Sequence, residues 1–502
     1  MTDAIKCTRS ISKPAEASVH SLAAIMMIYF ESGQTYPKSE FIRRRNVPTP
    51  KPRFFFGHSQ NPLARTSTSF QHIKTIYDQM RAHKYDYCGI YIFIRAFFMP
   101  LSPDHIKDIM LKDFAHFVDR GMYSNERDDP LSVHLLSLQG QKWKSLRAKL
   151  TPTFSSSKLK MMFGTLLDCG NQMLKSMEQL SKNPLDIKEI CACYTTDVIG
   201  SCAFGVDCNS FAETESEFRK YGRKALDLSI ETLLRLSIMI LGNAAKKLRI
   251  KLIDSQVSKF FLNVIKTALQ HRKENQIVRN DFLQLLIELK EKNQLNTEEI
   301  AAQAYLFFLA GFETSSTTMA FCMLELAGNE SIQDKVREEI FQVFDKYNGK
   351  LLYESLTDMK YLGQVIDETL RLYPSIPFIS RVCTKDYKIH NSEVVIEKGT
   401  RVFLPVYALH RDPEYYPSPD NFNPDRFNDE NKSKRHPFVY LPFGEGPRVC
   451  IGQRFGLMQV KMGLAILLKN YKFTVNRRTK LPVEFECNNF LLRVKGDIWL
   501  DA

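Results

Sequence analysis

The stretch Leu441–Phe455, "LPFGEGPRVCIGQRF", decides the fold of this chain. It places one cysteine, Cys450, after a turn containing glycine and proline and directly before "IGQRFGLMQVKMGLAILLKN", whose apolar periodicity predicts a helix. Gly444 and Gly446 permit a tight turn in which backbone N–H groups approach the sulfur. A helix start and a bound metal both favour the thiolate over the thiol. Cys450 is therefore a candidate metal ligand, and a buried structural cysteine is the alternative.

Length and composition fit a protein with a large core. The 502 residues are 44% hydrophobic and 25% charged, and no repeat or flexible linker divides them. The net charge of +13 is compatible with nucleic acid, an anionic membrane surface or an acidic protein partner. The 11 cysteines include no C-x-x-C pair, so we expect free thiols in a reducing compartment.

Most of the chain has the periodicity of amphipathic helices with charged outer faces. Clear examples are "KTALQHRKENQIVRNDFLQLLIELKEKN" (266–293) and "NESIQDKVREEIFQVFDKY" (329–347). By contrast, "YDYCGIYIFIRAFF" (85–98) is rich in aromatic and β-branched residues and predicts strands, as does the tail after Lys472. We predict a mainly α architecture with a small β-rich part.

Two segments have the pattern of a membrane contact. Val19–Phe30 is almost entirely apolar, and Arg43–Arg45 and a Pro-rich run follow it. As a helix it would span about 18 Å, less than the ~30 Å of a bilayer core. We assign residues 1–42 to a weak anchor or interfacial segment and residues 43–502 to the folded domain. Leu233–Asp254 is either a surface that dips into a membrane or a buried helix with a basic edge.

The segment "TEEIAAQAYLFFLAGFETSSTTMAFCMLELAGN" (297–329) predicts a long central helix. Asn296 and Glu299 form a capping-box pattern at its start, and Gly328 marks its end. About thirty helical residues extend for about 46 Å, enough to cross a whole domain.

Small residues interrupt the bulky side chains at the middle of this helix. Ala310 and Gly311 open a groove, and Thr314 lies one turn above Ala310 on the same side. A threonine hydroxyl there can bond the carbonyl four residues back, or a water, and so can relay protons. The alternatives are a Thr314 hydroxyl that its own helix satisfies and a Glu313 that is solvated or paired.

The cysteine loop and four further segments resemble the cytochrome P450 superfamily. The loop matches its haem-binding pattern F-x-x-G-x-R-x-C-x-G, and "AGFETS" (310–315) is similar to its oxygen-binding pattern [AG]-G-x-[DE]-T-[TS]. "ETLR" (368–371), "NPDRF" (423–427) and "WKSLR" (143–147) also match family motifs. The resemblance covers nearly the whole chain from about Arg43. It is greatest to insect microsomal members active on lipophilic foreign compounds.

The resemblance implies a P450 fold with a long helix over haem b and a role for each matching residue. Cys450 would be the axial ligand of the haem iron, and Glu313 and Thr314 would deliver protons. The other haem contacts would be Trp143, Arg147, Ala310, Arg381, Phe443, Arg448 and Gly452, with Arg120 as a further candidate for a propionate. The substrate pocket would be lined by Phe307, Phe308, Ala310, Thr314, Ile376, Pro377 and Phe378. The charge cluster that braces the cysteine loop would be Glu368, Arg371 and Arg426.

The implied activity is insertion of one oxygen atom from O2 into a lipophilic small molecule. Electrons would come from NADPH through NADPH-cytochrome P450 reductase, with cytochrome b5 as an additional partner, at the cytoplasmic face of the endoplasmic reticulum membrane. No nucleic-acid-binding motif occurs, so we do not expect a nucleic-acid partner. A haem-thiolate isomerase or dehydratase is one alternative, although such relatives often lack the acid–Thr pair. A haem-binding carrier or sensor is the other, but it would have no use for Thr314.

Overall fold

The computed structural model describes residues 46–53, 57–58, 67–92, 95–180, 184–212, 216–226, 246–247, 249–487 and 489–502. The predicted anchor, residues 1–42, lies outside these residues, as does most of Leu233–Asp254. Within the described ranges, no helix combines the length and the apolar character that crossing a bilayer requires.

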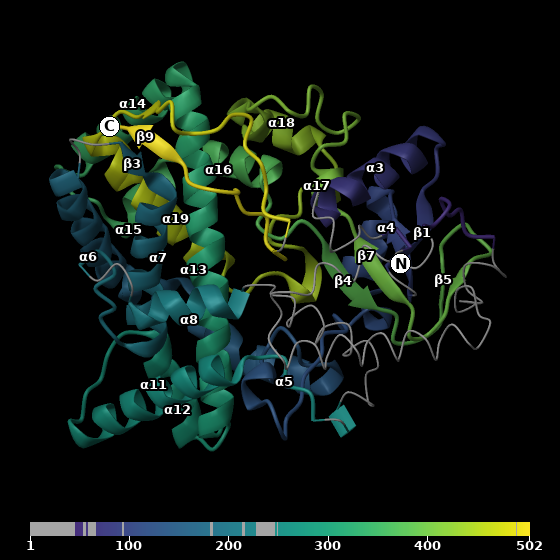
Figure 1. Cartoon of the computed structure of the whole chain (residues 1–502), viewed down its shortest axis with the longest axis horizontal. Helices are drawn as coiled ribbons and strands as arrows, with labels where there is room; N and C mark the ends of the chain where they lie inside the picture. Colours follow the sequence, from purple (N-terminus) through teal and green to yellow (C-terminus); the bar gives the residue numbers. More distant parts are fainter. Residues whose placement is uncertain are drawn as a thin grey trace, which may run out of the picture.

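Helices dominate the fold, as the periodicity predicts (Figure 1). They are α3 Ser69–Ala82, α4 Pro103–Lys107, α5 Gly140–Leu150, α6 Ser156–Leu180, α7 Ile187–Phe204, α8 Glu217–Leu226, α11 Ser255–Glu274, α12 Phe282–Glu291, α13 Thr297–Gly328, α14 Glu330–Lys346, α15 Tyr353–Asp358, α16 Lys360–Leu372, α17 Val406–Leu409, α18 Asp429–Lys434 and α19 Gln453–Asn470. The segment 266–293 is divided between α11 and α12. Asp281 begins α12 by accepting a hydrogen bond from the Gln284 amide.

Helix α13 is the predicted central helix and runs through the interior (Figure 1). The capping box forms as predicted: the Glu299 amide donates to Asn296 Oδ1, and the Asn296 amide donates to Glu299 Oε2, each over 2.8 Å. The helix packs against α7, α19 and α16, so most of its faces are buried.

The β part consists of small sheets from segments far apart in sequence. The largest has the order β1-β2-β7-β4, formed by Tyr87–Ile92, Arg95–Pro100, Arg401–Leu404 and Ile379–Val382. Strands β1 and β2, from the segment predicted to form strands, pair antiparallel. Strand β2 pairs with β7 in parallel, and β7 pairs with β4 antiparallel. A second sheet joins β3 Leu185–Asp186, β9 Trp499–Asp501 and β8 Thr474–Val475, and a third joins β5 Tyr387–Lys388 and β6 Val395–Ile396.

Two hydrophobic cores form around these elements. The larger is built from α6, α7, α13 and α19, and the smaller lies between α3 and the four-stranded sheet. Figure 1 shows the helical body beside the sheet-containing part, with α5 below the boundary. The functional cavity has residues of both cores in its lining.

Candidate functional site

A cavity of about 1010 Å³ lies between the two cores, and its lining is mainly apolar. It contains side chains from α5, α13, the loop before β4, β4 itself and the cysteine loop. Thirteen of the predicted residues line it: Arg120, Trp143, Arg147, Phe307, Ala310, Thr314, Ile376, Phe378, Arg381, Phe443, Arg448, Cys450 and Gly452. Residues spread over three hundred positions therefore face one space.

The cysteine loop is shaped by its glycines. Gly444 and Gly446 have φ of 69° and 71°, which side chains rarely adopt, and a Cβ at Gly446 would overlap the carbonyl oxygen of Met110. The Cys450 amide donates to the Phe443 carbonyl over 2.9 Å, which closes the loop ahead of α19. Cys450 lines the cavity and is, among the described cysteines, the one with an exposed side chain, although the surrounding protein encloses it.

The surroundings of Cys450 shift the pKa of its thiol in opposite directions. Burial raises the pKa of its thiol, whereas the backbone N–H groups of Gly452 and Gln453 and the charges of Arg120 and Arg147 oppose this rise. The predicted effect of the helix start is thus present, but desolvation outweighs it. A bound metal would supply the remaining stabilisation of the thiolate.

Four arginines, Arg120, Arg147, Arg381 and Arg448, gather near Cys450. Burial lowers the pKa of Arg120 to about 10 and of Arg448 to about 9. Burial also lowers the pKa of Arg381, and the charges of Arg120 and Arg448 lower it further. The Nε atoms of Arg120 and Arg381 are buried and make no hydrogen bond in the described structure. So much buried positive charge requires an anionic partner.

Two of these arginines donate hydrogen bonds to the backbone of the cysteine loop. Arg147 Nη1 donates to the Val449 carbonyl and Arg120 Nη2 to the Arg448 carbonyl, both over 2.9 Å. The Arg448 guanidinium stacks 4.0 Å from the centre of the Trp143 ring. A thiol, four arginines and an apolar space beside them fit haem b, with its iron and two propionates.

The centre of α13 presents Thr314 to the cavity. Its hydroxyl donates to the Ala310 carbonyl over 2.5 Å, and both residues line the space. Gly311 packs against α7, because a Cβ there would lie 2.8 Å from Ile199 Cδ1.

Three predicted site residues do not line the cavity. Glu313 is buried on another side of α13, with Oε1 2.6 Å from Arg493 Nε, and burial raises the pKa of its carboxyl. Phe308 packs in an aromatic cluster that includes Phe261 and Phe312, because it shares a helix face with Phe312 and not with Phe307 and Ala310. Pro377 contributes its carbonyl to the Tyr407 amide. These three side chains therefore lie outside the described lining of the cavity, and their predicted roles stay predictions.

Among the cavity residues that sequence reasoning did not name are two arginines, Arg95 and Arg401. Each is the first residue of an otherwise apolar strand, β2 "RAFFMP" and β7 "RVFL". In each case a charged residue at the start of an apolar strand could have marked the position in the sequence. The sequence does not show, however, that β2 pairs with β7, and this pairing brings the starts of the two strands into one sheet.

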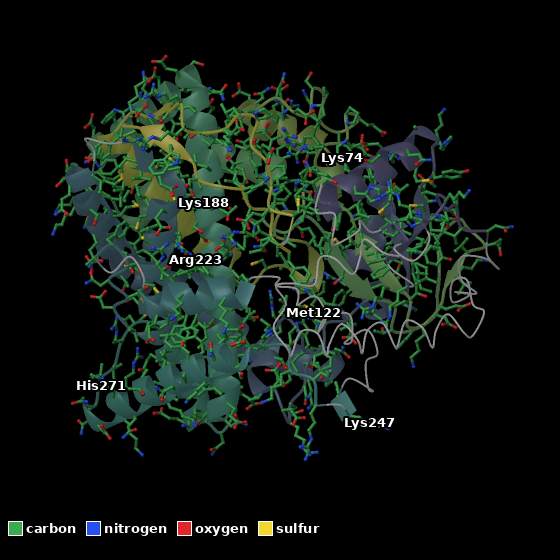
Figure 2. All side chains as sticks on the ribbon, in the orientation of Figure 1. Lys74, Met122, Lys188, Arg223, Lys247 and His271 are labelled. Atoms are coloured by element: carbon green, nitrogen blue, oxygen red, sulfur yellow. The ribbon has the colours of Figure 1, made fainter. Side chains whose placement is uncertain are left out.

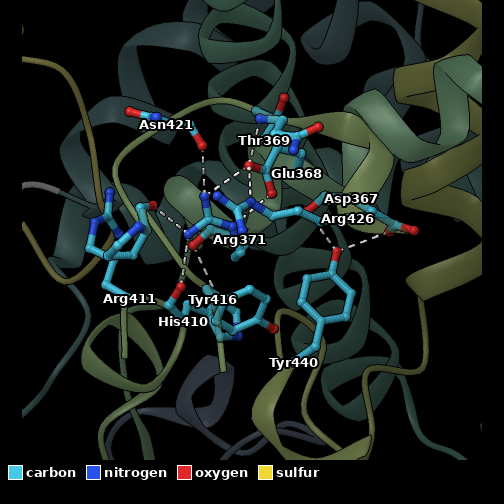
Figure 3. A network of polar contacts seen from close by, with 12 residues as sticks. Asp367, Glu368, Thr369, Arg371, His410, Arg411, Tyr416, Asn421, Arg426 and Tyr440 are labelled. Carbon is cyan, nitrogen blue, oxygen red and sulfur yellow. Dashed lines mark hydrogen bonds and ion pairs between the residues drawn. The ribbon is translucent and has the colours of Figure 1, made fainter. Parts of the chain in front are cut away.

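Figure 3 shows the predicted charge cluster, in which Glu368 and Arg371 of α16 lie beside Arg426. Glu368 and Arg371 are both 0% exposed and form two hydrogen bonds of 2.7 and 2.8 Å, and Arg426 Nε lies 3.4 Å from Glu368. Arg371 also donates to the His410 carbonyl over 2.9 Å. His410 Nε2 in turn accepts the Leu441 amide at the start of the loop over 2.8 Å. The cluster is thus connected to the loop through His410.

Acid should destabilise the fold through His410. Burial lowers its pKa to about 3, against 6.5 in an exposed histidine, so the unfolded chain binds a proton that the folded chain does not. Stability present above pH 6.5 is therefore lost as the pH falls toward 3, by up to about 1.4 kcal/mol per pH unit. Between pH 7 and 5, the free energy of unfolding measured with urea should fall less for His410→Asn than for the wild type.

A matched control for this experiment is His271→Asn. His271 is exposed at the end of α11, on the outer surface (Figure 2). This variant should keep the acid dependence of the wild type. If the free energy of unfolding depended on pH in the same way for the wild type and His410→Asn, the acid loss could not be attributed to His410.

Comparisons with known proteins agree with this geometry. The cytochrome P450 family model matches residues 47–500. The chain is 43% identical over 461 residues to probable cytochrome P450 6a13 of Drosophila melanogaster, which covers 91% of this chain and 93% of the relative. It is 42% identical over 469 residues to cytochrome P450 6a9 of the same organism, with 91% and 93% covered. For cytochrome P450 6a2 the identity is 39% over 475 residues, with 91% and 94% covered.

Proposed function

The chain belongs to the cytochrome P450 family and is a monooxygenase of the insect P450 6 type, and from this premise we propose that it oxidises a lipophilic small molecule with electrons that a separate reductase draws from NADPH. The observation that carries the proposal is the cavity, where a thiol, a threonine hydroxyl and apolar side chains face one another. Haem bound there supplies the activation of O2, which electron donation by a thiolate ligand favours.

The residues that would hold this cofactor follow from the charges in the cavity. Cys450 would ligate the iron, and Arg120, Arg147, Arg381 and Arg448 would neutralise the two propionates. Trp143 would keep Arg448 in place, while Phe443, Ala310 and Gly452 would border the macrocycle.

The remaining residues act on substrate and protons. Phe307, Ile376 and Phe378 provide an apolar wall that orients a hydrophobic substrate and excludes water. Thr314 Oγ1 is the proposed site from which a proton is delivered, because its hydroxyl can turn from the Ala310 carbonyl toward the cavity. Glu313 is proposed as an acid that supports this supply, since burial raises the pKa of its carboxyl and Arg493 fixes its position.

Thr314→Ala should uncouple electron consumption from product formation. A positioned proton donor contributes on the order of 10²-fold to a rate, so product per NADPH should fall by about 10- to 100-fold while hydrogen peroxide rises. Stopped assays that measure NADPH, peroxide and product in one sample test this. Thr314→Ser keeps the hydroxyl and should retain coupling. An unchanged ratio in Thr314→Ala would remove the proposed role of this residue.

The proposed function is tested by adding a P450 reductase, NADPH and lipophilic candidate substrates to the haem-loaded protein. We expect NADPH and O2 consumption that depends on substrate. An isomerase or dehydratase would instead turn substrate over without O2 or reductase. A carrier or sensor would bind haem and show no turnover.

We also propose a location at the cytoplasmic face of the endoplasmic reticulum membrane. The apolar Val19–Phe30 with Arg43–Arg45 supports contact with anionic lipid. The net charge of +13 supports docking of the acidic reductase, and of cytochrome b5, by charge complementarity.

A further inference from the structure

Three side chains that can ligate a metal lie close together outside the cavity. The carboxylates of Asp108 and Asp113 and the imidazole of His390 each offer one ligand atom, and these atoms all lie within 4.8 Å of one another. None of the three is among the described residues that line the cavity. The aspartates stand at the two ends of the π-helical turn η1, Asp108–Lys112, which follows α4, and His390 lies in the turn between β5 and β6. Figure 1 shows α4 and β5 in the sheet-containing part, away from α13.

The rare π-helical turn brings the two aspartates together. In an α-helix, residues five positions apart are separated by about 140° around the axis. Here the Asp113 amide donates to the Asp108 carbonyl over 2.8 Å, a hydrogen bond that spans five residues and widens the turn. The two carboxylates therefore approach the same point, although their like charges repel. A cation between them would relieve this repulsion.

His390 joins the aspartates from a distant part of the chain. Its Nε2 atom lies 2.9 Å from Asp113 Oδ2, and the Tyr387 hydroxyl donates to the same oxygen over 3.0 Å. Hydrogen bonds of the latter kind orient the ligating carboxylates of metal sites. The turn that carries His390 is fixed further by a hydrogen bond of 2.8 Å between the hydroxyls of Ser392 and Tyr87. The fold therefore holds all three ligands in place.

A positive charge already lies beside this group. Lys112 Nζ is 3.8 Å from Asp108 Oδ1 and 3.5 Å from His390 Nε2. The lysine side chain is 58% exposed, so it can turn into solvent at little cost when another cation arrives. A metal ion would therefore compete with Lys112 for the same position.

We propose that Asp108, Asp113 and His390 bind a divalent transition metal of the zinc class, with water completing the coordination. Zinc accepts imidazole nitrogen and carboxylate oxygen, whereas Mg²⁺ and Ca²⁺ prefer oxygen ligands alone. The metal would join η1 to the β5–β6 turn. The same η1 turn packs on the cysteine loop, because the Met110 carbonyl lies against Gly446. The metal site is thus separate from the haem site and adjoins the loop that forms it.

The test measures zinc binding to the haem-loaded protein by equilibrium dialysis and by titration calorimetry. The wild type should bind one more zinc ion per chain than His390→Ala. Asp113→Asn should weaken zinc binding at this site by at least about 10-fold, because it removes a ligand charge. Excess Mg²⁺ should leave the zinc bound, since the imidazole ligand favours transition metals.

Two further variants should change the affinity for zinc in opposite directions. Lys112→Met removes the competing charge and should tighten zinc binding by about two- to fivefold, the contribution of a surface ion pair. Tyr387→Phe removes the hydrogen bond that orients Asp113 and should weaken zinc binding by about 10-fold. The matched control is His271→Ala, which removes an exposed histidine of α11 outside this group and should bind zinc like the wild type.

Three results would overturn the proposal. Equal zinc binding by the wild type and His390→Ala would do so, and displacement of zinc by Mg²⁺ would show mere attraction to two carboxylates. Weaker zinc binding by Lys112→Met would contradict the position of the metal. The carbon monoxide spectrum should keep its red-shifted band in every variant. If His390→Ala lost that band, Asp113→Asn would decide the question, whereas a wild type without the band would reject the proposed function and leave the zinc test intact.

Discussion

Cys450→Ala is expected to abolish both the strongly red-shifted Soret band of the reduced carbon monoxide complex and all product formation. Cys450 provides the only thiol in the lining of the cavity, so no other described residue there can provide a thiolate. The protein should nevertheless fold, because burial already disfavours the charged form of this thiol when no metal is bound. Absorption spectra with and without carbon monoxide and far-ultraviolet circular dichroism measure the two effects.

Cys487→Ala is the matched control for this variant. Cys487 is half-buried and does not line the cavity, so its replacement should leave the spectrum unchanged. Retention of the red-shifted band in Cys450→Ala would mean that iron is bound elsewhere. The assignment of the site would then be wrong.

The second large effect is expected at Glu368. Glu368→Gln leaves Arg371 completely buried with its charge uncompensated, and losing one member of a buried pair costs about 3–5 kcal/mol. Urea unfolding of the variant should therefore show a large loss of stability. Because Arg371 also contacts the His410 carbonyl, and His410 binds the Leu441 amide, the variant should in addition lose haem more readily.

The pair Lys346–Asp358 provides the contrast. Its members are 2.7 Å apart but lie on the surface, with lysine and aspartate side chains 63% and 33% exposed. Asp358→Asn should change unfolding little, since solvent screens such pairs. A comparable loss for Asp358→Asn and Glu368→Gln would show that burial is not the cause.

Features encoded by short-range pattern were predictable from the sequence. The bounds of α13 follow from the Asn296–Glu299 capping box and from Gly328, and the strands β1 and β2 follow from their β-branched and aromatic residues. The conformation of the cysteine loop was also predictable from nearby residues, because the two glycines Gly444 and Gly446 determine its turn. The mainly α cytochrome P450 fold is confirmed.

Features that depend on contacts between distant segments were not predictable. The side chain of Glu313 is directed by Arg493, which is 180 positions away, and not by its neighbour Thr314. Arg95 and Arg401 meet only because β2 pairs with β7. The direction of the pKa shift of Cys450 depends on how deeply the thiol is buried. The sequence pattern of the helix does not reveal this burial.

The ion pair between Glu313 and Arg493 has a consequence for how this protein can diverge. The two residues lie on α13 and on the segment before β9, and both are largely buried. Substituting either residue alone would leave the other buried without a partner for its charge. A variant with only one of the two residues should therefore be less stable and be selected against. Descendants should therefore inherit both charges or neither, and the C-terminal tail should be under the same selection as the central helix although it is distant from it in sequence.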